Sequence, residues 1–115
     1  MAAPIVFFDI AGANDSQLRT FYSDIFGWRF SKQSQTTVDV ITPFGGAIRK
    51  DPSEKRIYIG VENVTDTLQE IVNCGGSVDA PRFEVPGVVV LGLFKDPAGN
   101  EMGLVEMDGG KPGIP

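Results

Sequence analysis

The sequence predicts an α+β fold, with two βαβββ modules in one chain, curled mixed sheets around a shared cleft, and one helix per module on the outside. Three observations lead to this prediction. A strand pattern, an amphipathic helix and three further strand patterns follow one another in residues 4–50, and the same order returns in residues 56–107. A polar connector, DPSEK at 51–55, separates the two. A module of about 50 residues buries little core alone, so we expect both to pack together as one domain, 1–115.

The first module opens on IVFFDI at residues 5–10, which alternates between two faces and predicts a strand. Asn14 or Asp15 can cap the helix that follows. The apolar residues of this helix recur at i, i+3, i+4, i+7 and i+8: Leu18, Phe21, Tyr22, Ile25 and Phe26. Gly27 is placed to end the helix. Further strands are predicted at 28–30, 36–42 and 46–50.

The second module repeats this order from RIYIGV at residues 56–61, which predicts a strand. Asn63 or Thr65 can cap the next helix, and Gly75–Gly76 ends it. Its apolar face carries Leu68, Ile71 and Val72. Strands are predicted at 77–79, 88–94 and 101–106, with a proline-bounded loop at 82–87. The tail, 108–115, has no helical or strand period and is expected to be irregular or docked on the rest of the chain.

The charge distribution argues against a nucleic-acid partner. The net charge is −5, and nucleic-acid binding needs a basic stripe. The adjacent basic pairs, Arg49–Lys50 and Lys55–Arg56, flank DPSE and predict a solvated loop.

The chain also carries no sign of a membrane or secretory protein. No apolar run approaches the ~18–20 residues of a membrane span. The first residues, MAAPIVFFDI, contain no basic leader or cleavage site, so no signal peptide is expected. The single cysteine, Cys74, excludes an internal disulfide, and we expect a cytoplasmic protein.

The absence of histidine restricts the chemistry most strongly. The sequence has no histidine and one cysteine. A histidine-based triad, a histidine general base and histidine metal ligands are therefore excluded, together with zinc sites built on histidine or on several cysteines.

The order of several motifs resembles the vicinal oxygen chelate superfamily, the glyoxalase, bleomycin-resistance and extradiol-dioxygenase group. The resemblance covers essentially the whole chain. The first half contributes FFDI and LRTFYSDIFGWRF, and the second half contributes RIYIGVENV, CGGSV and DPAGNEMGLVE. The resemblance implies paired βαβββ modules that curl around a cleft, often in a dimer, but it does not select a reaction.

The resemblance also implies where metal-using members place their ligands, on the first and last strand of each half. In the opening strand the position falls on Phe7 or Ile5, neither of which can bind a metal. In the second half the positions fall on Arg56, a fixed cation, and on Gly103. The strand GGAIRK offers no carboxylate or imidazole. The sequence therefore argues against metal-dependent glyoxalase or dioxygenase activity, and we expect no cofactor.

Alternation along the strands assigns residues to the two faces of each sheet. The helix side is expected to receive Val6, Phe8, Ile10, Ile57, Ile59, Val61, Met102 and Leu104. The candidate ligand-binding residues fall on the other side: Phe7, Asp9, Arg56, Tyr58 and Glu101.

Each of these candidates has a second interpretation. Arg56 can hold a ligand's carboxylate, sulfate or phosphate. Alternatively, Asp9 or Glu101 neutralises it, or it reaches solvent at the strand start. Phe7 and Tyr58 can stack on a planar ligand, or they fill a closed cleft or a dimer interface.

These observations lead to one main function and two alternatives. The main hypothesis is a metal-free protein that binds a small, partly aromatic or anionic molecule in the cleft and sequesters it, as a homodimer. The alternatives are a lyase or isomerase that uses the cleft carboxylates, and a non-catalytic interaction protein. Whether the chain is an enzyme is left open by the sequence.

Overall fold

The computed structural model describes residues 2–26, 28–30, 37–39 and 45–115, with only the backbone of 37–39. The chain forms two compact units, one of Phe7–Arg56 and one of Met1–Val6 together with Ile57–Pro115. Gly27, and most of the strand predicted at 36–42, lie outside the described residues. Neither helix of the described part has the length and apolar character needed to cross a membrane.

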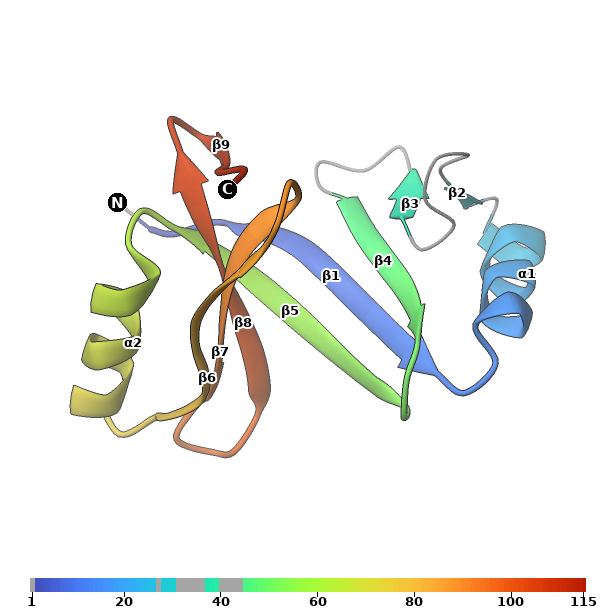
Figure 1. Cartoon of the computed structure of the whole chain (residues 1–115). Helices are drawn as coiled ribbons and strands as arrows, with labels where there is room; N and C mark the ends of the chain where they lie inside the picture. Colours follow the sequence, from blue (N-terminus) through green and yellow to red (C-terminus); the bar gives the residue numbers. More distant parts are fainter. Residues whose placement is uncertain (1, 27, 31–36, 40–44) are drawn as a thin grey trace. The chain divides into compact units, whose positions relative to one another are not determined.

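The unit Phe7–Arg56 holds the first βαβββ module, except for the first residues of its opening strand. Its elements are β1 (Ile5–Gly12), α1 (Asp15–Phe26), β2 (Arg29–Phe30), β3 (Thr37–Asp39) and β4 (Gly45–Lys50). The strand order is β2-β3-β4-β1, in which β1 and β4 run parallel and the other pairs antiparallel. Figure 1 shows β1 and β4 side by side.

Local sequence explains how α1 and β1 are arranged. Asn14 caps α1, because its side-chain oxygen accepts a hydrogen bond from the Gln17 amide at 3.0 Å. The Trp28 ring stacks on the Tyr22 ring of α1, with 4.8 Å between the ring centroids. Its centroid lies 5.3 Å from that of the Phe8 ring of β1. Phe8 therefore lies on the helix side of β1, as alternation predicted.

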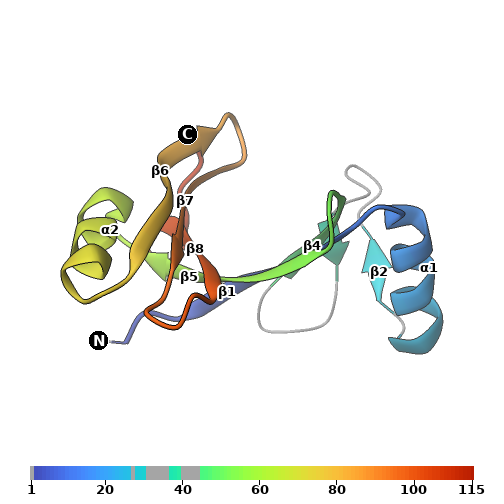
Figure 2. The ribbon, with the colours of Figure 1, turned by 90° about the horizontal axis from the view of Figure 1, so that it is seen from below.

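The other unit holds the second module. Its elements are β5 (Glu54–Val61), whose residues 54–56 belong to the unit Phe7–Arg56, α2 (Val64–Asn73), β6 (Ser77–Val85), β7 (Val89–Lys95), β8 (Glu101–Asp108) and β9 (Lys111–Pro112). The strand order is β5-β8-β7-β6, with β5 and β8 parallel and β9 paired antiparallel to β8. In Figures 1 and 2, α2 lies along the sheet formed by β6, β7 and β8.

The core of this unit lies between α2 and the sheet. It consists of Val64, Leu68, Phe94 and Leu104, against which Ile59, Val61, Ile71 and Met102 pack. Asn63 caps α2 by accepting a hydrogen bond from the Asp66 amide at 2.9 Å. Gly75 follows the helix with a φ of 98°, a left-handed conformation that glycine adopts without strain. Because Ile59, Val61, Met102 and Leu104 belong to this core, the helix-facing side of β5 and β8 is the one predicted from alternation.

Three local expectations are corrected. The strand predicted at 77–79 continues through Pro81 to Val85, in place of a loop at 82–87. A proline is tolerated there because β6 ends the described strand order and has irregular pairing on both sides of Ala80. The tail 108–115 contains a short strand, β9, which pairs with β8.

The third correction concerns the connector. β4, which contains Arg49, ends at Lys50, and β5 already begins at Glu54. The loop between these strands is therefore 51–53 and not 51–55 as the sequence indicated. Arg56 is 7% exposed. Arg49 and Arg56 lie in strands that the sequence predicted, at 46–50 and 56–61, and each pairs with a carboxylate of its own unit where the sequence indicated a solvated surface.

The α+β class with two βαβββ modules, each with one helix, is confirmed. The shared cleft stays a prediction.

Candidate functional site

Asp9 lies on β1 and is almost entirely buried, at 6% exposure. Arg49 of β4 binds it through Nε, which lies 2.9 Å from both carboxylate oxygens. The parallel register of β1 and β4 explains this contact: Asp9 is opposite Ala47, and Arg49 is two residues further along the same face. The carboxylate of Asp9 is therefore neutralised within its own unit.

Arg49 contacts two further carboxylates. Its Nη1 donates to Asp51 at 2.6 Å, and its Nη2 donates to Glu54. The pKa of Arg49 is raised above its ordinary value, chiefly by the hydrogen bond to Asp9. This guanidinium is therefore fixed by three partners.

Arg56 lies at the other side of Glu54. Its Nε is 3.9 Å from Glu54 Oε1, the oxygen to which Arg49 also donates. We name the set Asp9, Arg49, Asp51, Glu54 and Arg56 the Arg49 cluster. It contains two of the predicted ligand-binding residues, Asp9 and Arg56, and joins them through two residues that the sequence analysis did not select.

A signal for Arg49 was present in the sequence. Alternation along GGAIRK places Ala47 and Arg49 on one face, but only the parallel pairing of β1 with β4 brings that face beside Asp9. The sequence did not indicate a role for Glu54, because this residue belongs to the segment 51–55, which was predicted to be a polar connector.

Tyr58 lies beside Gly103, the last position at which the family resemblance implied a metal ligand. It pairs with Gly103 in the parallel register of β5 and β8, and it is 7% exposed. A Cβ atom on Gly103 would lie 2.4 Å from two atoms of the Tyr58 ring. The ring therefore covers the place where a side chain at position 103 would stand.

The remaining predicted residues are less enclosed. Phe7 is half-buried on β1, opposite Gly45 of β4. Glu101 is exposed at the start of β8, opposite Lys95 of β7. Phe7, Asp9 and Arg56 belong to one unit, and Tyr58 and Glu101 belong to the other. A joint role for the five residues in binding stays a prediction.

The donor set does not fit a metal ion. Within the described ranges, no three His, Cys, Asp or Glu side chains are placed to hold one. Both oxygens of the buried Asp9 carboxylate are held by Arg49. Arg56 and Gly103 stand at two of the positions that the resemblance implied for ligands.

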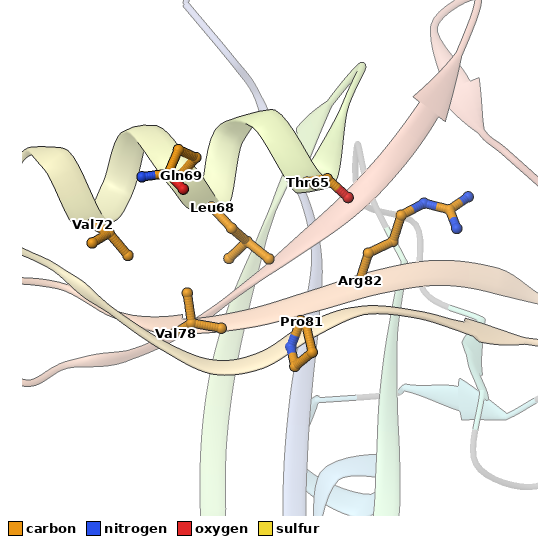
Figure 3. Close-up of a pocket in the computed structure, with 7 residues that line it drawn as sticks. All are labelled: Thr65, Leu68, Gln69, Val72, Val78, Pro81 and Arg82. Atoms are coloured by element: carbon orange, nitrogen blue, oxygen red, sulfur yellow. The ribbon is translucent and has the colours of Figure 1, made fainter.

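A groove lies elsewhere, between α2 and β6 (Figure 3). Its volume is about 160 Å³, and it is lined by Thr65, Leu68, Gln69, Val72, Val78, Pro81 and Arg82. Figure 3 shows Val72 of the helix and Val78 of the strand facing each other across it. The groove is on the helix side of the sheet, and none of the five predicted residues lines it.

Arg82, at one end of this groove, forms an ion pair with Glu106 of β8. Its Nη2 donates to Glu106 Oε1 at 2.9 Å and its Nε donates to Oε2 at 3.1 Å. Glu106 Oε2 also accepts from the Val64 amide at the start of α2, at 3.1 Å. The pKa of Glu106 is lowered mainly by the hydrogen bond from Arg82 and also by the hydrogen bond from the Val64 amide.

Glu106→Gln is expected to lower the free energy of unfolding at neutral pH by on the order of 1 kcal/mol. In the native protein the lowered pKa means that the unfolded chain takes up the proton first as the pH falls. The stabilisation is therefore complete above the ordinary value of 4.5 and is lost as the pH falls toward the folded-state pKa. Urea unfolding at several pH values should show a weaker pH dependence for the variant below pH 4.5. Glu70→Gln, the same change on an exposed helix residue, should change the free energy of unfolding at neutral pH by less than about 0.5 kcal/mol. Equal slopes for native protein and Glu106→Gln would contradict the assignment.

The chain is similar to known proteins in sequence and in fold. No family model matches it. It is 26% identical over 111 residues to a protein named "Putative glyoxylase CFP32" in Mycobacterium bovis and Mycobacterium tuberculosis. The match covers 84% of this chain and 42% of that protein, so the chain spans less than half the length of the curated relatives.

Among solved structures, a methylmalonyl-CoA epimerase in complex with methylmalonyl-CoA and NH4+ matches with a TM-score of 0.66 at 13% identity, over 98% of this chain and 100% of that one. The hypothetical protein BH1468 from Bacillus halodurans C-125 matches with a TM-score of 0.68 at 12% identity, over 94% and 96%. The methylmalonyl-CoA epimerase from Mycobacterium tuberculosis gives a TM-score of 0.66 at 12% identity, over 90% and 87%.

These structural similarities show the fold, and the glyoxylase match adds a relation in sequence. Both agree with the motif order from FFDI to DPAGNEMGLVE and with the two βαβββ modules. The similarities are consistent with the resemblance to the vicinal oxygen chelate superfamily that the motif order indicated.

Proposed function

We propose that this chain is a glyoxalase/bleomycin-resistance-like protein that works without a metal, binds a small, partly aromatic or anionic molecule, and sequesters it. The observation that carries the proposal is Arg56 on β5, a guanidinium that is only 7% exposed and lies beside Glu54 in the Arg49 cluster.

Arg56 supports an anionic group on the ligand. A guanidinium always carries its charge, and its planar fork matches carboxylate, sulfate and phosphate groups. Arg56 stands at a position where the superfamily resemblance implied a metal ligand. Because its side chain is a cation, this position favours an anion over a metal ion. Structural neighbours in complex with methylmalonyl-CoA, which is itself an anion, agree with this chemistry.

The aromatic part of the proposal rests on Tyr58 and Phe7. The Tyr58 ring forms a flat apolar surface over Gly103, and Phe7 is half-buried on β1. Aromatic rings of this kind favour planar ligands through offset or edge-to-face packing.

The environment of Asp9 favours sequestration over the lyase or isomerase alternative. A general base must be free to take a proton from the substrate. Both Asp9 oxygens are instead held by Arg49 at 2.9 Å, and the pair must break before Asp9 can act. We therefore propose that the protein binds its ligand without converting it. We also propose that it is a cytoplasmic homodimer.

Native mass spectrometry of the protein purified from cells tests this proposal, together with elemental analysis of the same sample. We expect a bound small molecule of discrete mass, no stoichiometric transition metal, and a homodimer. Arg56→Gln should lose the molecule, whereas Arg29→Gln, the same change on an exposed arginine of the same unit, should retain it. A stoichiometric metal, or retention of the molecule by Arg56→Gln, would contradict the proposal.

A further inference from the structure

We propose that the Glu54 carboxylate occupies the place of a ligand's carboxylate between Arg49 and Arg56, and that Glu54 must move out before an anionic ligand binds. The inference rests on the proposed function. It adds the chemical class of the ligand, a carboxylate, and a competing internal group that controls access to the site.

The geometry places one oxygen of Glu54 between two guanidinium groups. Arg49 Nη2 donates to Glu54 Oε1, and Arg56 Nε lies 3.9 Å from the same oxygen. A carboxylate at this place is attracted by two positive charges at once, in a site where Arg56 is largely removed from water.

The other two nitrogen atoms of Arg49 already bind carboxylates. Its Nε binds both oxygens of Asp9, and its Nη1 binds Asp51 at 2.6 Å. Asp9 is buried on β1 and holds Arg49 in place. The Nη2 group is therefore the donor that an incoming carboxylate would take over from Glu54.

Glu54 is the exchangeable carboxylate that lies between the two arginines of the Arg49 cluster. Its side chain is 32% exposed, compared with 8% for Asp9 and 7% for Arg56; Asp51 is more exposed, at 53%, but its ion pair is with Nη1 of Arg49. It is the first residue of β5 and follows the exposed segment 51–53. A rotation of the Glu54 side chain toward solvent would free Arg49 Nη2 and the side of Arg56 that faces Glu54, without moving the sheet.

Isothermal titration calorimetry with benzoate tests the inference, because benzoate combines a carboxylate with an aromatic ring. If Glu54 fills the place about nine-tenths of the time, its removal strengthens apparent binding by about tenfold. We therefore expect Glu54→Gln to bind benzoate about tenfold more tightly than the native protein. Benzamide, the neutral analogue of similar shape, should show no such gain.

Asp51→Asn is the matched control. It removes the same charge from a partner of the same arginine, but Asp51 binds Nη1, whereas Glu54 binds Nη2 and lies beside Arg56. A general change in charge near the surface would affect benzoate binding by less than about twofold. Urea unfolding should first establish that both variants are folded.

The outcomes separate this inference from the proposed function. Equal gains in Asp51→Asn and Glu54→Gln would reduce the effect to net charge and overturn the inference. So would unchanged or undetectable benzoate binding by folded Glu54→Gln. If Arg56→Gln loses benzoate while Glu54→Gln binds as the native protein does, the proposed function stands and only the role of Glu54 fails. If Arg56→Gln binds benzoate as well as the native protein, the proposed function itself fails.

Discussion

Arg49→Met is expected to lower the free energy of unfolding by about 3–5 kcal/mol, the typical cost of removing one partner of a buried ion pair. The main cause is Asp9, which is 6% exposed and receives both of its Arg49 contacts at 2.9 Å. Without the guanidinium, Asp9 must stay charged without a partner, take up a proton, or pull β1 open to water. Urea unfolding followed by Trp28 fluorescence and circular dichroism measures the change.

Lys50→Met provides the control for this prediction. It removes the same charge from the next residue of β4, where the side chain is exposed, and surface substitutions of this kind usually change stability by less than about 0.5 kcal/mol. The double variant Asp9→Leu/Arg49→Met should recover most of the loss, because a matched apolar replacement of both partners is often neutral. Equal losses from Arg49→Met and Lys50→Met would show that the pair does not stabilise the fold.

Gly103→Ala is expected to cost about 1–3 kcal/mol, as overpacking of a tightly packed site does. The added Cβ would lie 2.4 Å from Cδ2 and Cε2 of Tyr58, and this ring is itself buried and has little room to move. Gly103→Glu should be at least as unfavourable. Thermal and urea unfolding of the folded variants measure both effects.

Gly45→Ala is the corresponding control. It is also a strand glycine, but a Cβ atom there meets no atom of the described residues within 4 Å. The same substitution should therefore leave stability nearly unchanged. In a Tyr58→Ala background, Gly103→Ala should cost much less than in the native chain; an undiminished cost would mean that the ring is not the cause.

Local patterns in the sequence predicted the elements and their buried faces well. Alternation correctly placed Ile59 and Leu104 toward α2, because residues two apart on a strand share a face. Asn14 and Asn63 were identified as possible caps because a short polar side chain before an apolar helix pattern can satisfy a free amide. These features depend only on near neighbours in the chain.

The features that were missed depend on distant pairing. The bond between Asp9 and Arg49 joins residues 40 positions apart and exists only because β1 and β4 are parallel neighbours. The extension of β6 through Pro81 depends on the place of that strand at the end of the described order, which a local reading of proline cannot supply. Of the Arg49 cluster, Asp9 and Arg56 were selected from the sequence, and Arg49 and Glu54, which join them, were not; the binding role of the selected residues stays a prediction.

The contact between Tyr58 and Gly103 also restricts how this chain could change over evolution. A carboxylate at position 103 collides with the ring while Tyr58 is present, and a smaller residue at position 58 leaves a void while position 103 is glycine. Each single substitution is therefore unfavourable unless the other has already occurred. A lineage that recovered a side chain at this position would have to pass through a less stable intermediate, so mutational scans of single residues would not find that route.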